Sequence, residues 1–339
     1  MSKIKKEKPI VMPREFTIRN NRGEEVACEN RPVRYEWYTY LFIVSVLILP
    51  IIHFLVFYVY LHFDSFYIAF CKYYMTGEKA GKAYWVGFEN FKEVLNELST
   101  ADSELLLSFR NTAITFFVGF AYWPFSIALS YFLYKKIRGY QLFRIFFYIP
   151  SILSGVVTSS FVLAICGSYG PMVPIVTKLW NLEMAPSSIF TDSTFANLFI
   201  NLHLIWGGIP GNMILWAGTF ARIPDSVIES GQLEGIGALR EIWQIIIPLV
   251  WPTFVLLFIT MWAGFFSAGG AVFLLTGGGG YGTQTLPNWQ YMKVYNVKSA
   301  YNNAYTYLAA FGMMLSVVAA TVSLSVRHLA NKFNQGVEY

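Results

Sequence analysis

The polar residues with the most specific spacing in this chain lie in a charged interlude between two long apolar segments. Pro224 can open a short helix there, and Asp225 and Glu229 then lie near its positive N-terminal end, which favours carboxylates. Gly235 and Gly237 interrupt the helix, because glycine lets a chain turn tightly or approach another surface closely. The interlude therefore predicts a helix–turn–helix that binds another protein.

A second amphipathic run follows this turn and leads to Pro248, which marks entry into the next apolar segment. Its apolar residues recur at helical spacing. They are Leu239, Ile242, Trp243, Ile246 and Ile247. From the residues alone, an amphipathic hairpin that lies on the membrane surface is the alternative to a hairpin that docks on a protein.

The other reactive side chains form no catalytic set. The four histidines are His53, His62, His203 and His328. None has metal-ligand spacing to a cysteine or carboxylate, and three scattered cysteines are too few for a disulfide framework. The run from Gly277 to Gly282 matches a dinucleotide fingerprint only in form, and Thr283 stands where a phosphate-binding loop requires lysine. We expect no catalytic residue, metal or nucleotide site in this chain.

The composition indicates a membrane protein. Hydrophobic residues make up 55% of the chain and charged residues 13%, whereas soluble proteins average roughly 25% charged. A helix needs about 20 mostly apolar residues to cross a bilayer. Six such stretches predict an all-α integral membrane protein with six transmembrane helices. Their expected ranges are 37–63, 109–134, 145–166, 195–220, 249–275 and 304–326.

The distribution of Lys and Arg predicts the orientation. The N-terminal tail, the loop after the second span, the central loop and the end of the chain hold most of these residues and are expected to face the cytoplasm. The tail then lies near anionic lipid headgroups, which we favour over binding to nucleic acid. Both termini are expected to be cytoplasmic, with the acidic loop after the first span outside.

The central loop resembles a known motif. Residues 229–248 are similar to the EAA loop of permease subunits of bacterial ABC importers, which reads Glu-Ala-Ala, then Gly, then Ile-x-Leu-Pro at this spacing. The chain departs from that pattern with Ser230 and Gly231 for the two alanines, Glu234 for Asp and Ile247 for Leu. Gly231 is expected to loosen the first helix by roughly 1 kcal/mol relative to Ala.

Other segments resemble the carbohydrate branch of this family. Residues 85–91 are similar to its "vGleNy" segment, and residues 138–150 to its "rG…fR…lP" segment. Asn111-Thr112 at the second span and residues 275–283, similar to "LTgGgP…T", complete the resemblance. Gly280 replaces a proline that is common there, so we expect a flexible outer turn. The resemblance covers roughly residues 85–327.

The resemblance implies a type I ABC importer permease with a MetI-like core and a cytoplasmic coupling-helix loop. The implied parts are a cytoplasmic tail (1–36), a first transmembrane helix (37–63), an extracytoplasmic loop (64–104), the permease core (105–326, with the coupling loop 221–248) and a C-terminal tail (327–339). The implied ATPase-coupling residues are Glu229, Ser230, Gly231, Leu233, Glu234, Gly235, Ile236, Ile245 and Pro248. Ile228, Leu233 and Ile236 are expected to be apolar anchors in a groove of the ATPase.

The family also implies partners and a substrate class. It implies a bacterial cell-membrane complex of two homologous permeases, different from one another, two ATPase subunits and an extracytoplasmic solute-binding protein, importing a carbohydrate of oligosaccharide size. ATP and Mg²⁺ would belong to the ATPases, so this chain is expected to be no enzyme and to hold no cofactor. The alternatives are an importer for a peptide, amino acid or phosphate, a secondary transporter, or a membrane scaffold or receptor.

A path for a neutral sugar would need aromatic rings for stacking and amides for its hydroxyl groups. Asn201, Gly208 and Asn212 fall on one face of the fourth span. Pro210 frees a carbonyl there, which is tolerated where a helix lines a cavity. The expected path residues are Asn201, Trp206, Asn212, Trp262 and Phe266. The alternative is that these residues pack helices together or lie in the interfacial belt.

Overall fold

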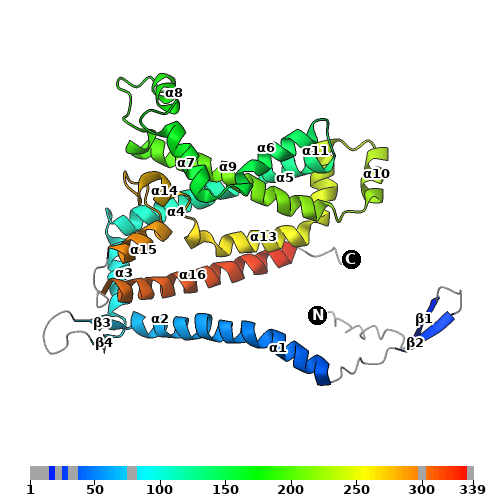
Figure 1. The fold of residues 1–339 in the computed structure, drawn as a ribbon, viewed down its shortest axis with the longest axis horizontal. Coiled ribbons are helices and arrows are strands. Elements are labelled where there is room, and N and C mark those ends of the chain that lie inside the picture. The colour runs from blue at the N-terminus through cyan, green and yellow to red at the C-terminus, as the bar shows by residue number, and fades with distance from the viewer. Residues whose placement is uncertain (1–14, 20–24, 30–36, 75–81, 297–302, 334–339) are drawn as a thin grey trace, which may run out of the picture. The chain divides into compact units, whose positions relative to one another are not determined.

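A computed structural model describes residues 15–19, 25–29, 37–74, 82–296 and 303–333 (Figure 1). Helices dominate these residues, and two small antiparallel hairpins are the only sheets among them. The predicted all-α class is therefore confirmed. The chain divides into two compact units, residues 1–63 and 64–339.

The first unit contains a β-hairpin and most of a long helix, whose last residues belong to the second unit. β1 (Glu15–Arg19) pairs antiparallel with β2 (Glu25–Glu29), which the expected polar tail did not anticipate. The helix runs through α1 (Trp37–Phe54), the π-helical η1 (Leu55–Tyr60) and α2 (Leu61–Ala69). It continues six residues beyond the predicted end at residue 63, because apolar residues resume after Asp64. The rest of the predicted tail 1–36 lies outside the described residues.

Four helices in the described chain are long and apolar enough to cross a membrane. They are the 33-residue helix Trp37–Ala69, α4 (Glu104–Ala121) with α5 (Trp123–Tyr134), α9 (Ser193–Phe220) and α16 (Asn303–Phe333). Side chains cap two of them, since Ser103 accepts the Leu106 N–H and Asp192 accepts the N–H groups of Thr194 and Phe195. These helices agree with the first, second, fourth and sixth predicted spans.

The other two predicted spans are bent. α6 (Tyr140–Ile152) and α7 (Gly155–Cys166) meet at 102°, and the helix Ala238–Leu249 meets α13 (Trp251–Ala263) at 79°. The third and fifth predicted spans, 145–166 and 249–275, are therefore each broken by a bend. Ser154 caps α7 through its side chain, so a new helix begins there. The total reaches six spans if each bent pair counts as one.

The second unit carries connecting elements at both ends of its long helices (Figure 1). At one end lie α3 (Glu89–Ser99), α8 (Met172–Leu179), the 3₁₀ turn η2 (Ile189–Thr191), α14 (Val272–Thr276), α15 (Leu286–Tyr295) and the hairpin of β3 (Cys71–Tyr73) and β4 (Ala83–Trp85). A second 3₁₀ turn, η4 (Phe265–Ser267), follows α13.

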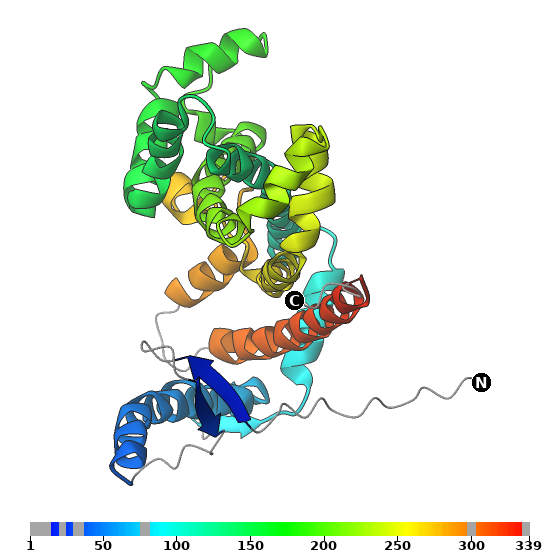
Figure 2. The same cartoon turned by 90° about the vertical axis from the view of Figure 1, so that its right-hand side faces the viewer.

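The opposite end carries the central loop. It contains α10 (Asp225–Leu233), α11 (Ala238–Glu241), the π-helical η3 (Ile242–Ile246) and α12 (Ile247–Leu249). This end faces the viewer in Figure 2. We call residues 224–249 the hairpin.

A buried apolar core joins the hairpin to the spans. It contains Trp123, Ile127 and Tyr131 of α5, Trp216 and Phe220 of α9, and Ile223, Ile228, Ile242, Ile246 and Val250 of the central loop. Two further cores lie elsewhere in this unit, one between α7, α8, α9 and α14 and one between α3, α4, α15 and α16. The hairpin is thus part of the packed bundle.

Candidate functional site

The first helix of the hairpin ends in the turn that the sequence predicts. Pro224 precedes α10 as its cap, so the helix begins at Asp225. At the other end the Gly235 N–H donates to the Gln232 carbonyl at 3.0 Å, and the Ile236 N–H donates to the Gly231 carbonyl at 3.2 Å. These two bonds form a Schellman cap, with Gly235 at φ +73° in its left-handed position. The turn places the next helix back across the first.

The exposed face of α10 carries charge and one large apolar side chain. Leu233 is 90% exposed, and Glu229, Ser230 and Glu234 are exposed beside it. Ile236 is half-buried. Ile228, which the sequence suggested as an apolar anchor for a partner, is only 6% exposed. It points into the core with Ile242 and Ile246, so that expectation is wrong for this residue.

Gly231 lets the two helices of the hairpin approach closely. It is buried, and a Cβ atom at this position would lie 2.7 Å from Cδ1 of Ile245. Real Cβ atoms are not found that near a carbon atom, since dispersion contacts are best at about 3.5–4.0 Å. Glycine in place of the family's alanine at residue 231 therefore permits this close packing against the second helix.

The second helix of the hairpin has two apolar sides. Ile242 and Ile246 point into the core, at 7% and 0% exposure. Leu239 and Trp243 point outward, at 75% and 69% exposure. The apolar residues of this run therefore do not share one buried face: the pair Ile242 and Ile246 is buried, and the pair Leu239 and Trp243 is exposed. Pro248 is exposed within α12, and the sharp bend comes at Val250.

A buried ion pair joins the hairpin to α5, and sequence reasoning missed it. Lys135 Nζ lies 2.6 Å from Oε1 of Glu241, whose side chain is 4% exposed. The buried Tyr131 interacts electrostatically with the same carboxylate. The sequence carried only a weak signal of it, since Glu241 stands between the charged Arg240 and the apolar Ile242.

The glycine-rich turn at the opposite end is held in place by side chains of α4. Asn111 Nδ2 donates to the carbonyls of Gly282 and Gln284, at 2.8 and 2.9 Å. Thr112 Oγ1 accepts the Leu286 N–H at 2.8 Å. Thr283 is fully buried and bonds to the Gly280 carbonyl. The expectation of a flexible turn is therefore wrong, because this segment is bonded on both sides.

Asparagines of the expected sugar path are engaged within the chain. Asn201 Nδ2 donates to Asn197 O at 2.8 Å, which leaves its buried Oδ1 without a partner. Asn212 Nδ2 donates to Gly208 O at 3.2 Å, and its side chain is hydrogen-bonded to Tyr122. A Cβ at Gly208 would lie 2.7 Å from the Tyr122 ring. The predicted polar face of α9 is thus covered by Tyr122 at this level.

The aromatic residues of the expected path lie in different places. Trp206 is 36% exposed and lines an apolar cavity of about 230 Å³ with Phe161 and His203. Trp262 packs against Phe116, with ring centroids 5.1 Å apart, and lines a second apolar cavity, between α13 and α16. Phe266 packs in the core around α4 and α15. Among the cavities of the described chain, none collects the five expected path residues.

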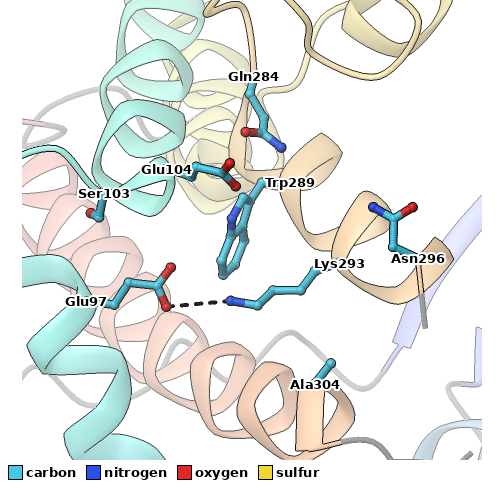
Figure 3. A pocket seen from close by; sticks show the side chains of 8 residues that line it. All are labelled: Glu97, Ser103, Glu104, Gln284, Trp289, Lys293, Asn296 and Ala304. Atoms are coloured by element: carbon cyan, nitrogen blue, oxygen red, sulfur yellow. Dashed lines mark ion pairs between the residues drawn. The ribbon is translucent and has the colours of Figure 1, made fainter. Parts of the chain in front are cut away.

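A polar cavity lies between α3, α4 and α15 (Figure 3). Its volume is about 420 Å³. Lys293 Nζ lies 3.5 Å from Oε2 of Glu97 and 4.4 Å from the centre of the Trp289 ring. Tyr307 donates a hydrogen bond to the same Glu97 oxygen. Glu104 and Gln284 line the opposite wall.

The start of α3 is fixed by charges and by an amide. Lys72 Nζ lies 2.6 Å from Glu93 and 3.1 Å from Glu89. Burial opposes the charged form of Lys72, but the hydrogen bonds that Lys72 donates to Glu93 and Glu89 outweigh it and raise the lysine pKa above its ordinary value. Asn90 is fully buried and donates to the carbonyls of Ala69 and Cys71.

Metal ligation finds no support in the described ranges, where no three His, Cys, Asp or Glu side chains gather in a way that could hold an ion. The predicted absence of a cofactor stays a prediction.

Long apolar helices, two bent helix pairs and a solvent-facing hairpin define a multi-pass membrane protein. The chain belongs to the family of binding-protein-dependent transport system inner membrane components, whose model matches residues 123–335. It is therefore a permease component of a transport system in the cell membrane.

Individual relatives agree with this family. The multiple sugar-binding transport system permease protein MsmF of Streptococcus mutans is 25% identical over 310 residues, which are 89% of this chain and 98% of that protein. The galactooligosaccharides transport system permease protein GanP of Bacillus subtilis is 26% identical over 277 residues, covering 77% of this chain and 63% of that protein.

A solved structure shares the fold. A chain of a bacterial ABC transporter involved in the import of the acidic polysaccharide alginate superposes with a TM-score of 0.68, at 18% identity. The match covers 88% of this chain and 98% of that chain. The predicted permease fold is therefore confirmed.

Proposed function

We propose that this chain is the permease subunit of an ATP-driven importer for a carbohydrate of oligosaccharide size. The observation that carries the proposal is the match to MsmF, which spans nearly the whole length of both proteins. GanP supports the same substrate class. A second candidate is import of glycerol 3-phosphate, because the sn-glycerol-3-phosphate permease UgpA of Rhizobium meliloti is 24% identical over 258 residues.

The proposed mechanism uses the hairpin as the contact for a cytoplasmic ATPase. Glu229, Leu233 and Glu234 form an exposed set beside the Gly235 turn, which fits helix-in-groove binding. Glu229 would pair with a basic residue of the ATPase, as the family resemblance implies. Shifting a two-state balance from 1:99 to 99:1 needs about 5.5 kcal/mol of differential interaction. The hairpin shares a buried core with α5 and α9, so this energy has a direct route to the spans.

The same proposal includes the partners and the orientation. Two ATPase subunits hold ATP and Mg²⁺, a second homologous permease completes the path, and an extracytoplasmic binding protein delivers the solute. Lys135, Lys136 and Arg138 follow α5 at the hairpin end of the bundle. The excess of basic residues there supports a cytoplasmic location for this end and for both termini.

We propose that the sugar contacts lie at the path residues, and we rank these residues by how accessible their side chains are. Trp206 is the strongest candidate, because its ring is partly exposed beside a cavity. Asn201 is next, since its Oδ1 atom has no partner. Asn212, Trp262 and Phe266 would need their present packing to open before they could contact a solute.

The experiment is reconstitution of the complete complex in vesicles. Raffinose, maltotetraose, galactotriose, glycerol 3-phosphate and an alginate oligosaccharide, each radiolabelled, are offered with the binding protein, with ATP enclosed or with a proton gradient alone. We expect ATP-dependent uptake of one or more of the saccharides. Uptake of glycerol 3-phosphate alone would select the second candidate, and full uptake on a proton gradient without ATP would refute both.

A further inference from the structure

The ion pair between Lys135 and Glu241 joins the hairpin to the C-terminal end of α5, where Lys135 is the cap residue. Glu241 is the last residue of α11 and directly precedes the π-helical η3. Its side chain is 4% exposed and that of Lys135 is 20% exposed. Tyr131, one turn before Lys135, interacts electrostatically with the Glu241 carboxylate and is 2% exposed. Lys135 also lies 5.7 Å from the centre of the Tyr131 ring.

A buried carboxylate without partners is strongly unfavourable. The side chain of Glu241 therefore has to stay close to Tyr131 on α5 and to Lys135 at the end of that helix. The apolar core under the hairpin adds binding energy, but apolar burial is non-directional and lets helices slide. An ion pair of 2.6 Å to a nearly buried carboxylate favours one register, because any shift that separates the two groups leaves a buried charge unpaired.

We propose that Glu241 is a positioning residue that, with Lys135 and Tyr131, ties the hairpin to α5 so that both move as one body. The inference rests on the proposed function, because the ATPase is the source of the displacement. When a closing ATPase dimer displaces α10, the tie transfers the displacement to α5. The shared core then carries it to α9 through Trp216 and Phe220. Without the tie, α10 moves while the spans lag behind.

The test uses the complete complex with four versions of the pair. Glu241→Gln and Lys135→Met each leave one group unpaired. Glu241→Leu with Lys135→Met removes both charges, and such neutral replacements of buried pairs are often tolerated for stability. Glu241→Lys with Lys135→Glu reverses the pair. Lys136→Met is the matched control, because Lys136 is the exposed neighbour of Lys135.

Saccharide uptake per ATP hydrolysed is the first readout, with raffinose, maltotetraose and galactotriose as probes. We expect the neutral double variant to assemble, to hydrolyse ATP and to lose about tenfold in uptake per ATP, within the usual range of coupling effects. The reversed pair recovers most of this loss, and Lys136→Met loses none. A merely structural role would lower assembly and ATP hydrolysis together and leave the ratio unchanged.

A distance measurement provides a readout that needs no saccharide. Spin labels at Gln232 on α10 and Phe132 on α5, both exposed, report whether these elements move together. The distance between the labels is compared without ATP and with ATP plus a chelator that prevents hydrolysis. We expect it to stay the same in the protein with the native Lys135–Glu241 pair and to change or broaden in the neutral double variant. Unchanged distances and normal uptake per ATP in that variant would overturn the tie. If the native complex transports none of the probes, the proposed function fails. The spin-label distances then still test whether the Lys135–Glu241 pair makes α10 and α5 move together.

Discussion

Gly235 occupies a backbone conformation that other residues adopt only with strain. At φ +73° an L side chain costs roughly 1 kcal/mol or more. Gly235→Ala is therefore expected to loosen the hairpin and to lower uptake per ATP, with the permease still inserted. Gly237→Ala is the matched control, because Gly237 has φ −72° and open space around a Cβ. Equal uptake ratios for the two variants would contradict the role of the Gly235 turn.

Glu229 is the charged residue for which the coupling proposal makes its sharpest prediction. Glu229→Lys is expected to convert a charge-assisted bond to the ATPase into repulsion, a loss of about 2 kcal/mol or on the order of thirtyfold in coupling. Membrane insertion and basal ATP hydrolysis should persist. Glu183→Lys makes the same charge change at an exposed position beyond α8 and serves as control. Normal uptake by the Glu229 variant would remove this residue from the coupling contact.

At the scale of elements, the contact of α9 with Tyr122, which lies between α4 and α5, depends on the absence of a side chain at Gly208. A Cβ there would lie 2.7 Å from the Tyr122 ring, and overpacking of this kind typically costs about 1–3 kcal/mol. Gly208→Ala is expected to lower the thermal stability of the purified permease. Gly211→Ala adds a methyl group one turn away in open space, and we expect no loss there. Both variants are heated, and the fraction of permease that stays folded is measured by fluorescence-detected size-exclusion chromatography.

The clamp from α4 onto the glycine-rich turn is a second contact between elements. Asn111→Ala removes both hydrogen bonds and leaves the Gly282 and Gln284 carbonyls without that donor, at a cost of about 1–3 kcal/mol for each buried carbonyl. We expect faster proteolysis of residues 276–286. Asn197→Ala, which removes a bond within α9 only, is the control. Unaltered cleavage in the Asn111 variant would show that other contacts hold the turn.

At the scale of the whole molecule, the orientation can be tested with single cysteines. Tyr169 is fully exposed in the turn after α7, and Gln232 is exposed on α10 at the other end. With the hairpin in the cytoplasm, a membrane-impermeant thiol reagent should label Tyr169→Cys in intact cells and Gln232→Cys only after permeabilisation. Labelling of Gln232→Cys from outside would reverse the proposed orientation and remove the ATPase contact.

The sequence was sufficient where a local rule decides the structure. Glycine at residue 235 ends a helix by a known cap, and long apolar runs mark the straight spans. Hydropathy shows where apolar segments lie and not how one helix is oriented to the next, so it could not predict the 102° bend near Ser154. The ion pair of Glu241 with Lys135 joins residues over 100 positions apart, and no local rule connects them. The Asn111 clamp bridges 171 residues to Gly282, a separation that only the fold brings together.

The close approach at Gly231 has a consequence for how this loop tolerates change. Because a methyl group at residue 231 would meet Cδ1 of Ile245 at 2.7 Å, the volumes of these two side chains are linked. Ile245→Val removes that terminal carbon and makes room for alanine at residue 231. In a library randomised at both positions and selected for growth on the transported solute, larger residues at one position should be recovered together with smaller ones at the other.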